Sequence, residues 1–88
     1  PVAADWRGEG ANWTNGVVHL SIEVKRPGAV KMTLGQQGKE DQVVHEGDLT
    51  VGLHEWEFPW ADASSPVSAR LACTGHSTER RLSDESQA

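Results

Sequence analysis

Three aromatic residues stand at alternate positions in the stretch Trp56-Glu57-Phe58-Pro59-Trp60. In an extended chain, alternate side chains point to the same face. Trp56 and Trp60 would then lie roughly 13 Å apart, the length of about two to three sugar units of an extended β-linked glucan. Flat indole faces suit the C–H faces of pyranose rings, and a tryptophan side chain loses little entropy when it is fixed. The spacing therefore indicates an aromatic surface for a carbohydrate.

The pattern before this stretch favours exposure of the aromatic side chains. Apolar residues take the odd positions of 49–53 and are expected to face the core. If the strand continues without interruption, the aromatic residues at even positions lie in solvent, where a row of them marks a binding surface. The alternative is a bulge or turn at His54-Glu55, which would turn the aromatic side chains inward and leave Glu55 and Glu57 in solvent.

Two further tryptophans and several polar residues complete the candidate site. Trp6 and Trp13 lie in a glycine-rich segment, where a tryptophan either contacts a ligand at the edge of the fold or folds back to plug its end. Of the tryptophans, we favour Trp60 as the residue that faces the ligand. The predicted ligand-binding residues are Trp6, Asn12, Trp13, Gln36, Trp56, Trp60 and Asp62.

Composition limits the classes of protein to which the chain can belong. With 88 residues it forms one domain, and 36% apolar residues are enough for a modest core. A net charge of −5 argues against binding to nucleic acid or to an anionic membrane surface. One cysteine excludes an internal disulfide and a cysteine-based zinc cluster. Four tryptophans beside one phenylalanine and no tyrosine are more than a core of this size requires.

Apolar and polar residues alternate along most of the chain, which predicts strands rather than helices. Residues 17–26 and 29–35 are expected to pair as a hairpin around Arg26-Pro27-Gly28. The other expected strands are 2–6, 42–45 (followed by a turn at 46–48), 49–54, 67–73 and 78–82. We therefore predict an all-β protein, a small single-domain antiparallel β-sandwich of about six to eight short strands. The sandwich is expected to span residues 1–82, with 83–88 as a polar tail or the start of a linker.

Catalysis and metal binding have little support in the sequence. Glu55 and Glu57 would share a face, and paired carboxylates can hydrolyse glycosides, but such enzymes need a deep cleft in a larger scaffold. The four histidines are not paired at the spacing of metal ligands. We therefore expect no enzymatic activity and no metal or other cofactor.

A short, acidic, tryptophan-rich β-domain with a Trp-x-Phe-x-Trp stretch resembles the carbohydrate-binding modules of bacterial cellulases and endoglucanases. The small family that it most resembles is family eighty-one. The residues that carry the resemblance are Trp56, Phe58, Trp60 and the loop Asn12-Trp13-Thr14-Asn15-Gly16. The resemblance implies a β-sandwich, secretion from a bacterium and no catalysis. It also implies a monomer that binds β-glucans such as cellulose, mixed-linkage glucan or xyloglucan and targets an attached glycoside hydrolase to them.

The alternative is a structural spacer, a fibronectin-like or immunoglobulin-like module between the domains of a secreted protein. A spacer accounts for the strands and the polar tail equally well, but it does not account for the surplus of tryptophan.

Overall fold

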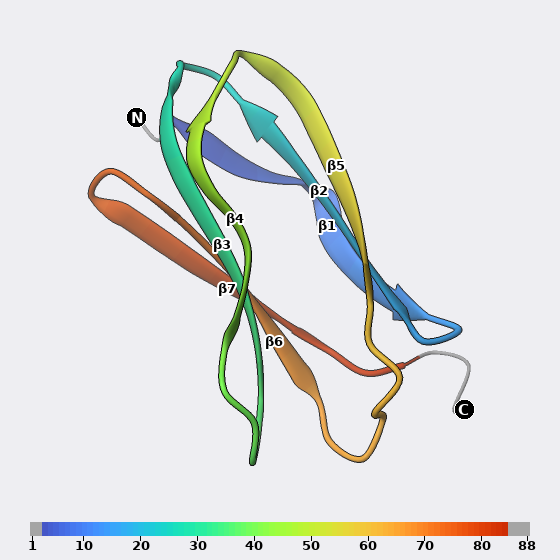
Figure 1. The fold of residues 1–88 in the computed structure, drawn as a ribbon. Coiled ribbons are helices and arrows are strands. Elements are labelled where there is room, and N and C mark those ends of the chain that lie inside the picture. The colour runs from blue at the N-terminus through green and yellow to red at the C-terminus, as the bar shows by residue number, and fades with distance from the viewer. Residues whose placement is uncertain (1–2, 85–88) are drawn as a thin grey trace.

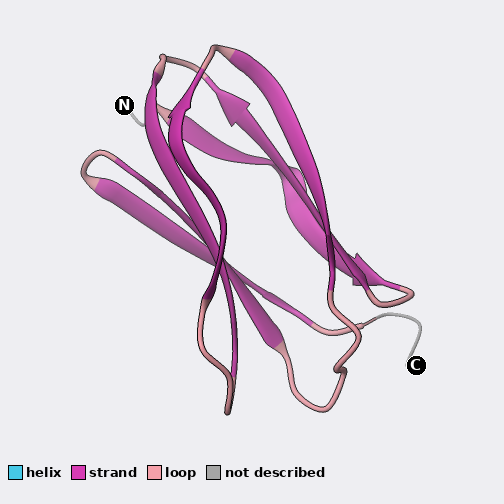
Figure 2. Cartoon of the chain, in the orientation of Figure 1, coloured by secondary structure: helices cyan, strands magenta, loops and turns pink. Residues whose placement is uncertain are grey.

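Seven antiparallel strands form two sheets that pack face to face (Figure 1). The structure, a computed structural model, describes residues 3–84, and Figure 2 shows only strands and loops in that range. The strands are β1 (Ala4–Thr14), β2 (Val17–Val24), β3 (Gly28–Gln36), β4 (Gln42–Leu49), β5 (Gly52–Pro59), β6 (Val67–Cys73) and β7 (His76–Leu82). The protein is thus a small β-sandwich, as predicted.

One sheet has three strands in the order β1-β2-β5, and the other has four in the order β4-β3-β6-β7. The fourth strand pairs with the third, whereas in the constant-type immunoglobulin sandwich it joins the sheet of the fifth strand. Two turn residues with positive φ, Asn15 and Gly16, connect β1 to β2, as is typical of a tight hairpin.

The core lies between the sheets and follows the two-residue period of the sequence. In β2, Val18, Leu20, Ile22 and Val24 are all buried, and the polar residues between them are not. In β6, Val67, Ala69 and Leu71 are buried in the same way. The alternation of apolar residues therefore places the correct face of both strands inward.

The predicted pairing of 17–26 with 29–35 is wrong, because β2 and β3 belong to different sheets. The segment Arg26-Pro27-Gly28 does turn the chain, but it carries it from one sheet to the other. The backbone N–H groups of Lys25 and Arg26 donate to the carbonyl of Ala3, at 2.7 and 3.2 Å. These bonds fix the start of the crossing against the beginning of β1, where it cannot close a hairpin.

The first strand is longer than expected. In place of a strand at 2–6 and a glycine-rich loop, β1 continues to Thr14 and is interrupted by a bulge between Trp6 and Ala11. Gly8 and Gly10 supply the positive φ angles of the bulge, 61° and 74°. Val2, which the prediction included, lies outside the described residues.

The predicted turn at 46–48 is also wrong, because β4 runs through it to Leu49. The final strand begins two residues earlier than expected, at His76. Ser83 and Asp84 were assigned to the tail, but Asp84 is buried and its Oδ2 accepts a hydrogen bond from the backbone N–H of Gly16, at 3.1 Å. The folded unit therefore reaches Asp84, and the rest of the predicted tail, 85–88, lies outside the described residues.

Candidate functional site

The predicted exposed platform of tryptophans is wrong. Trp6, Trp13 and Trp60 are only 7%, 1% and 7% exposed, and the partly buried Trp56 packs against the core with Phe58. The cause is an interruption of the strand at Thr50 and Val51, where the chain crosses from β4 in one sheet to β5 in the other. Beyond the break the alternation is reversed. Val51 and Leu53 are 59% and 51% exposed, and the aromatic side chains turn inward, as does Leu49 on the preceding strand.

The alternative prediction, that the aromatic residues turn inward and Glu55 and Glu57 lie in solvent, is therefore the one that the structure confirms. Only its position differs, because the interruption lies at residues 50–51 and not at His54-Glu55. The preference for Trp60 as the exposed tryptophan is wrong, and Trp56 is the least buried of the four.

Four of the predicted site residues meet at one end of the sandwich, where they close the core. The indole N–H of Trp13 donates to the carbonyl of Trp60 at 2.9 Å. The indole N–H of Trp60 donates to Gln36 Oε1 at 3.2 Å, and Gln36 Nε2 donates to the carbonyls of Asp62 and Ser65 at 2.7 and 2.8 Å. Buried polar groups need such partners, so this network explains the residues as structural elements.

Asp62 has its own role at this end. Its Oδ1 accepts a hydrogen bond from the backbone N–H of Ser64 at 2.9 Å, and its Oδ2 lies 3.0 Å from Lys39 Nζ. Hydrogen bonds from Ser64, together with the ammonium group of Lys39, hold the pKa of the Asp62 carboxyl far below its ordinary value of 3.8. The Lys39 ammonium also lies 5.9 Å from the centre of the Trp60 ring.

Replacing Asp62 by Asn is expected to lower the melting temperature at neutral pH. A carboxyl with a depressed pKa stabilises the fold above its unfolded pKa, and this contribution disappears as the pH falls towards the folded pKa. The difference between the natural chain and Asp62→Asn should therefore be full above pH 3.8 and shrink below it. Melting curves between about pH 7 and pH 2 measure this, and a difference that stays constant over the range would contradict it.

Trp6 and Trp56 occupy the two open edges of the sandwich. Trp6 packs under Gly10 and beneath the guanidinium of Arg80, which lies 5.8 Å from its ring centre. Trp56 lies between two histidines, with ring centres 5.5 Å from His45 on β4 and 6.1 Å from His54 on β5. Both rings are largely covered by protein, so neither offers a flat exposed surface to a sugar.

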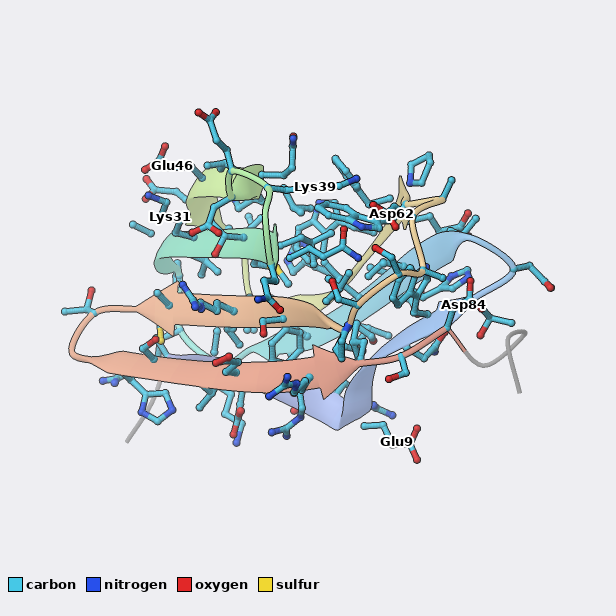
Figure 3. All side chains as sticks on the ribbon, turned by 90° about the horizontal axis from the view of Figure 1, so that it is seen from below. Glu9, Lys31, Lys39, Glu46, Asp62 and Asp84 are labelled. Carbon is cyan, nitrogen blue, oxygen red and sulfur yellow. The ribbon has the colours of Figure 1, made fainter. Side chains whose placement is uncertain are left out.

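A groove of about 690 Å³ lies on the outer face of the three-stranded sheet. We call it the outer groove. Arg7, Glu9 and Gly10 of the β1 bulge form one wall. Figure 3 shows Glu9 extending from β1 on the side of the molecule away from Lys39 and Asp62. The other lining residues are Ala11, Asn12, Thr14, His19, Leu20, Ser21, Glu55, Trp56 and Glu57.

The side chains of the outer groove form rows across the strands. Asn12 of β1 is paired with His19 of β2, and His19 is paired with Glu57 of β5. His19 Nδ1 lies 3.9 Å from a carboxylate oxygen of Glu57. Ser21 and Glu55 form the next row. One face of the sheet thus presents an amide, an imidazole, a hydroxyl and two carboxylates to solvent.

Comparisons with protein families, with curated proteins and with solved structures find no match to this chain. The function must therefore be argued from the site. Of the predicted site residues, Asn12 and Trp56 line the outer groove. Trp60 and Asp62 line a smaller cleft of about 280 Å³, where Asp62 is already paired with Lys39.

Sequence reasoning missed His19, Ser21, Glu55 and Glu57 as members of one site. Their polar, outward positions were visible, but the pairing of β2 with β5 brings them together, and no local pattern predicts that pairing. Among residues 3–84, no group of three or more His, Cys, Asp or Glu residues could hold a metal ion. In the same range, no helix is long and apolar enough to cross a membrane.

The outer groove can donate and accept hydrogen bonds over a broad area. Asn donates and accepts through its amide, Ser and Thr through their hydroxyls, and a neutral imidazole through its two nitrogens. Carboxylates accept hydrogen bonds from hydroxyl groups, and these charge-assisted bonds are among the stronger ones. This set of groups suits a ligand that is rich in hydroxyls.

Proposed function

We propose that this chain is a non-catalytic carbohydrate-binding domain that holds a β-linked glucan in the outer groove. The observation that carries the proposal is the row Asn12, His19 and Glu57, three neighbouring polar side chains that line one groove of about 690 Å³. The sheet beneath the row packs on the core, so the backbone positions from which these side chains project are fixed relative to one another.

The size of the row fits a short piece of a sugar chain. Adjacent strands lie about 4.8 Å apart, so three strands span about 10 Å, or roughly two sugar rings. The bulge wall at Arg7 to Gly10 closes one side of the groove and limits the direction in which a chain can lie. These dimensions favour recognition of one extended chain over adsorption to a broad crystalline surface.

Binding would rest on hydrogen bonds more than on stacking, because the tryptophans are largely covered. Hydrogen bonds exchanged with water contribute about 0.5–1.5 kcal/mol each, so a few of them give weak binding. We expect dissociation constants of roughly 10 µM to 1 mM. In a secreted, extracellular bacterial protein, a domain of this kind would hold an attached glycoside hydrolase near its polysaccharide.

Affinity gels with soluble polysaccharides test the proposal. The natural chain is expected to be retarded by a β-1,4-glucan or a mixed-linkage glucan. The double variant Asn12→Ala/His19→Ala should bind at least about tenfold more weakly than the natural chain, since it loses two hydrogen-bonding groups. The matched control is Thr33→Ala/Ser68→Ala, two polar residues on the outer face of the other sheet.

The control should bind like the natural chain, and both variants should keep its β circular dichroism spectrum. If no glucan retards the natural chain, the proposed function is wrong. If the groove variant binds as well as the control, the outer groove is not the site.

A spacer module is the second candidate, and two observations favour it. The start of β1 and the end of β7 lie at opposite ends of the molecule (Figure 1), as suits a module placed in line between others. Packing of Trp6, Trp13 and Trp60 into the core also accounts for most of the tryptophan surplus. A spacer would not be retarded in any of the gels, so the same experiment separates the two functions.

A further inference from the structure

The outer groove carries more negative than positive charge. Glu9, Glu55 and Glu57 contribute three carboxylates, and Arg7 is the one lysine or arginine among the lining residues. Within the described part of the chain, the Glu9 and Glu55 side chains form no ion pair, and Glu57 pairs only with the imidazole of His19. Arg80 reaches the bulge, where its Nε donates to the backbone carbonyl of Glu9 at 3.3 Å, but it forms no ion pair with the Glu9 carboxylate.

Four acidic residues elsewhere on the described surface are paired. Glu46, Asp41 and Glu79 lie on or beside the four-stranded sheet, and each has a lysine or arginine within 4.0 Å. Asp62 is likewise paired with Lys39. Asp5, Glu23, Glu40 and Asp48 have no ion pair among the described residues either, so the outer groove is distinguished by three carboxylates that line one hollow with a single arginine.

We propose that the outer groove selects sugar chains by their charge and binds chains of protonated amino sugars more tightly than neutral chains, and uronic-acid chains least. This inference rests on the proposed function, because it names the class of glycan that the same site prefers. An ammonium group on a sugar ring would replace the missing counter-charge of Glu55 or Glu9, whereas a carboxylate on the sugar would be repelled by both.

The expected selectivity is moderate and depends on salt. Exposed ion pairs are weak individually, so two or three of them should change the affinity by about tenfold in each direction. Salt at about 0.2 M screens charges over roughly 7–8 Å, which should remove most of the difference. A neutral chain should bind equally well at low and at moderate salt, because it releases no counterions.

Three oligosaccharides of equal length with a β-1,4-linked backbone test this inference by calorimetry. They are a cello-oligosaccharide, a chitosan oligosaccharide and a carboxymethylated cello-oligosaccharide. All three are measured at one pH below the pKa of the chitosan amine groups. At about 20 mM salt, the amino chain should bind about tenfold more tightly than the neutral chain, and the carboxymethylated chain about tenfold more weakly.

A pair of variants separates the groove from the net charge. Glu55→Gln/Glu57→Gln and the control Glu46→Gln/Glu79→Gln each remove two carboxylates, the first from the groove and the second from the other sheet. The groove variant should bind the three probes with nearly equal affinity, whereas the control should keep the preference of the natural chain.

The outcomes distinguish the two proposals. Equal binding of all three probes by the natural chain, or an equal loss of preference in both variants, overturns the charge selection and leaves glucan binding intact. Failure of the neutral chain to bind overturns the proposed function. If in that case the amino chain still binds in the groove, charge selection is upheld and β-glucan is the wrong ligand. If no probe binds, both proposals are overturned.

Discussion

Trp13→Ala is expected to reduce the free energy of unfolding by about 3–5 kcal/mol, the usual cost of truncating a buried large aromatic residue. The Trp13 side chain is 1% exposed, and its indole N–H holds the carbonyl of Trp60 at 2.9 Å. Its removal leaves both a cavity and an unpaired carbonyl at the closed end of the sandwich. Small domains have only roughly 5–15 kcal/mol of stability, so the variant should be marginally folded or unfolded at 37 °C.

Chemical denaturation followed by circular dichroism measures this loss. Trp56→Ala is the matched control, because it makes the same substitution at a tryptophan that is only partly buried. It should lose about 1–3 kcal/mol, in proportion to the smaller area that it covers. A loss in Trp56→Ala equal to or larger than that in Trp13→Ala would show that the end network does not stabilise the fold as described.

Gly10→Ala is expected to reduce the free energy of unfolding by about 2–4 kcal/mol, for two separate reasons. Gly10 has a φ of 74°, which is unfavourable for any residue with a Cβ. An added Cβ would also lie 2.5 Å from the Cβ of Trp6 and 2.8 Å from its Cε3. Trp6 or the bulge must then move, and the wall of the outer groove moves with it.

Gly8→Ala separates the two causes. Gly8 has a similar φ of 61°, but a Cβ there meets no atom within 4 Å. Its loss should be about 1–2 kcal/mol from the backbone alone. Equal melting temperatures for Gly8→Ala and Gly10→Ala would contradict the close packing of Trp6 under the bulge.

The fold class could be predicted because it depends on a local signal. Apolar and polar residues alternate along β2 and β6, so the signal lies within each strand's own sequence. In β2, every second residue from Val18 to Val24 is apolar and buried. Which strand pairs with which is not local information. The Arg26-Pro27-Gly28 turn is compatible with a hairpin and with a crossing, and the contact of Lys25 and Arg26 with Ala3 favours the crossing.

The candidate site was less predictable, because one short connection decides which side chains are exposed. Thr50 and Val51 carry the chain between sheets, and only Gly52, with a φ of 132°, marks the change in the sequence. A break of this kind exchanges the two faces of a strand. It turned the predicted platform inward and placed Glu55 and Glu57 outward. The outer groove then required the pairing of β2 with β5, which brings His19 beside Glu57.

Because the chain crosses between the two sheets, its strand order also limits how fast it can fold. Val18 lies opposite Phe58, and Val30 lies opposite Cys73, so the central ladders join segments far apart in the chain. Long loops must close before these contacts form, and sandwiches of this type fold over milliseconds to seconds. The β1–β2 hairpin around Asn15-Gly16 is local and can form within about 1–10 µs. The indole of Trp13 should therefore stay partly exposed in the hairpin until β5 pairs with β2 and brings the carbonyl of Trp60 to it, so tryptophan fluorescence should change in this slower step.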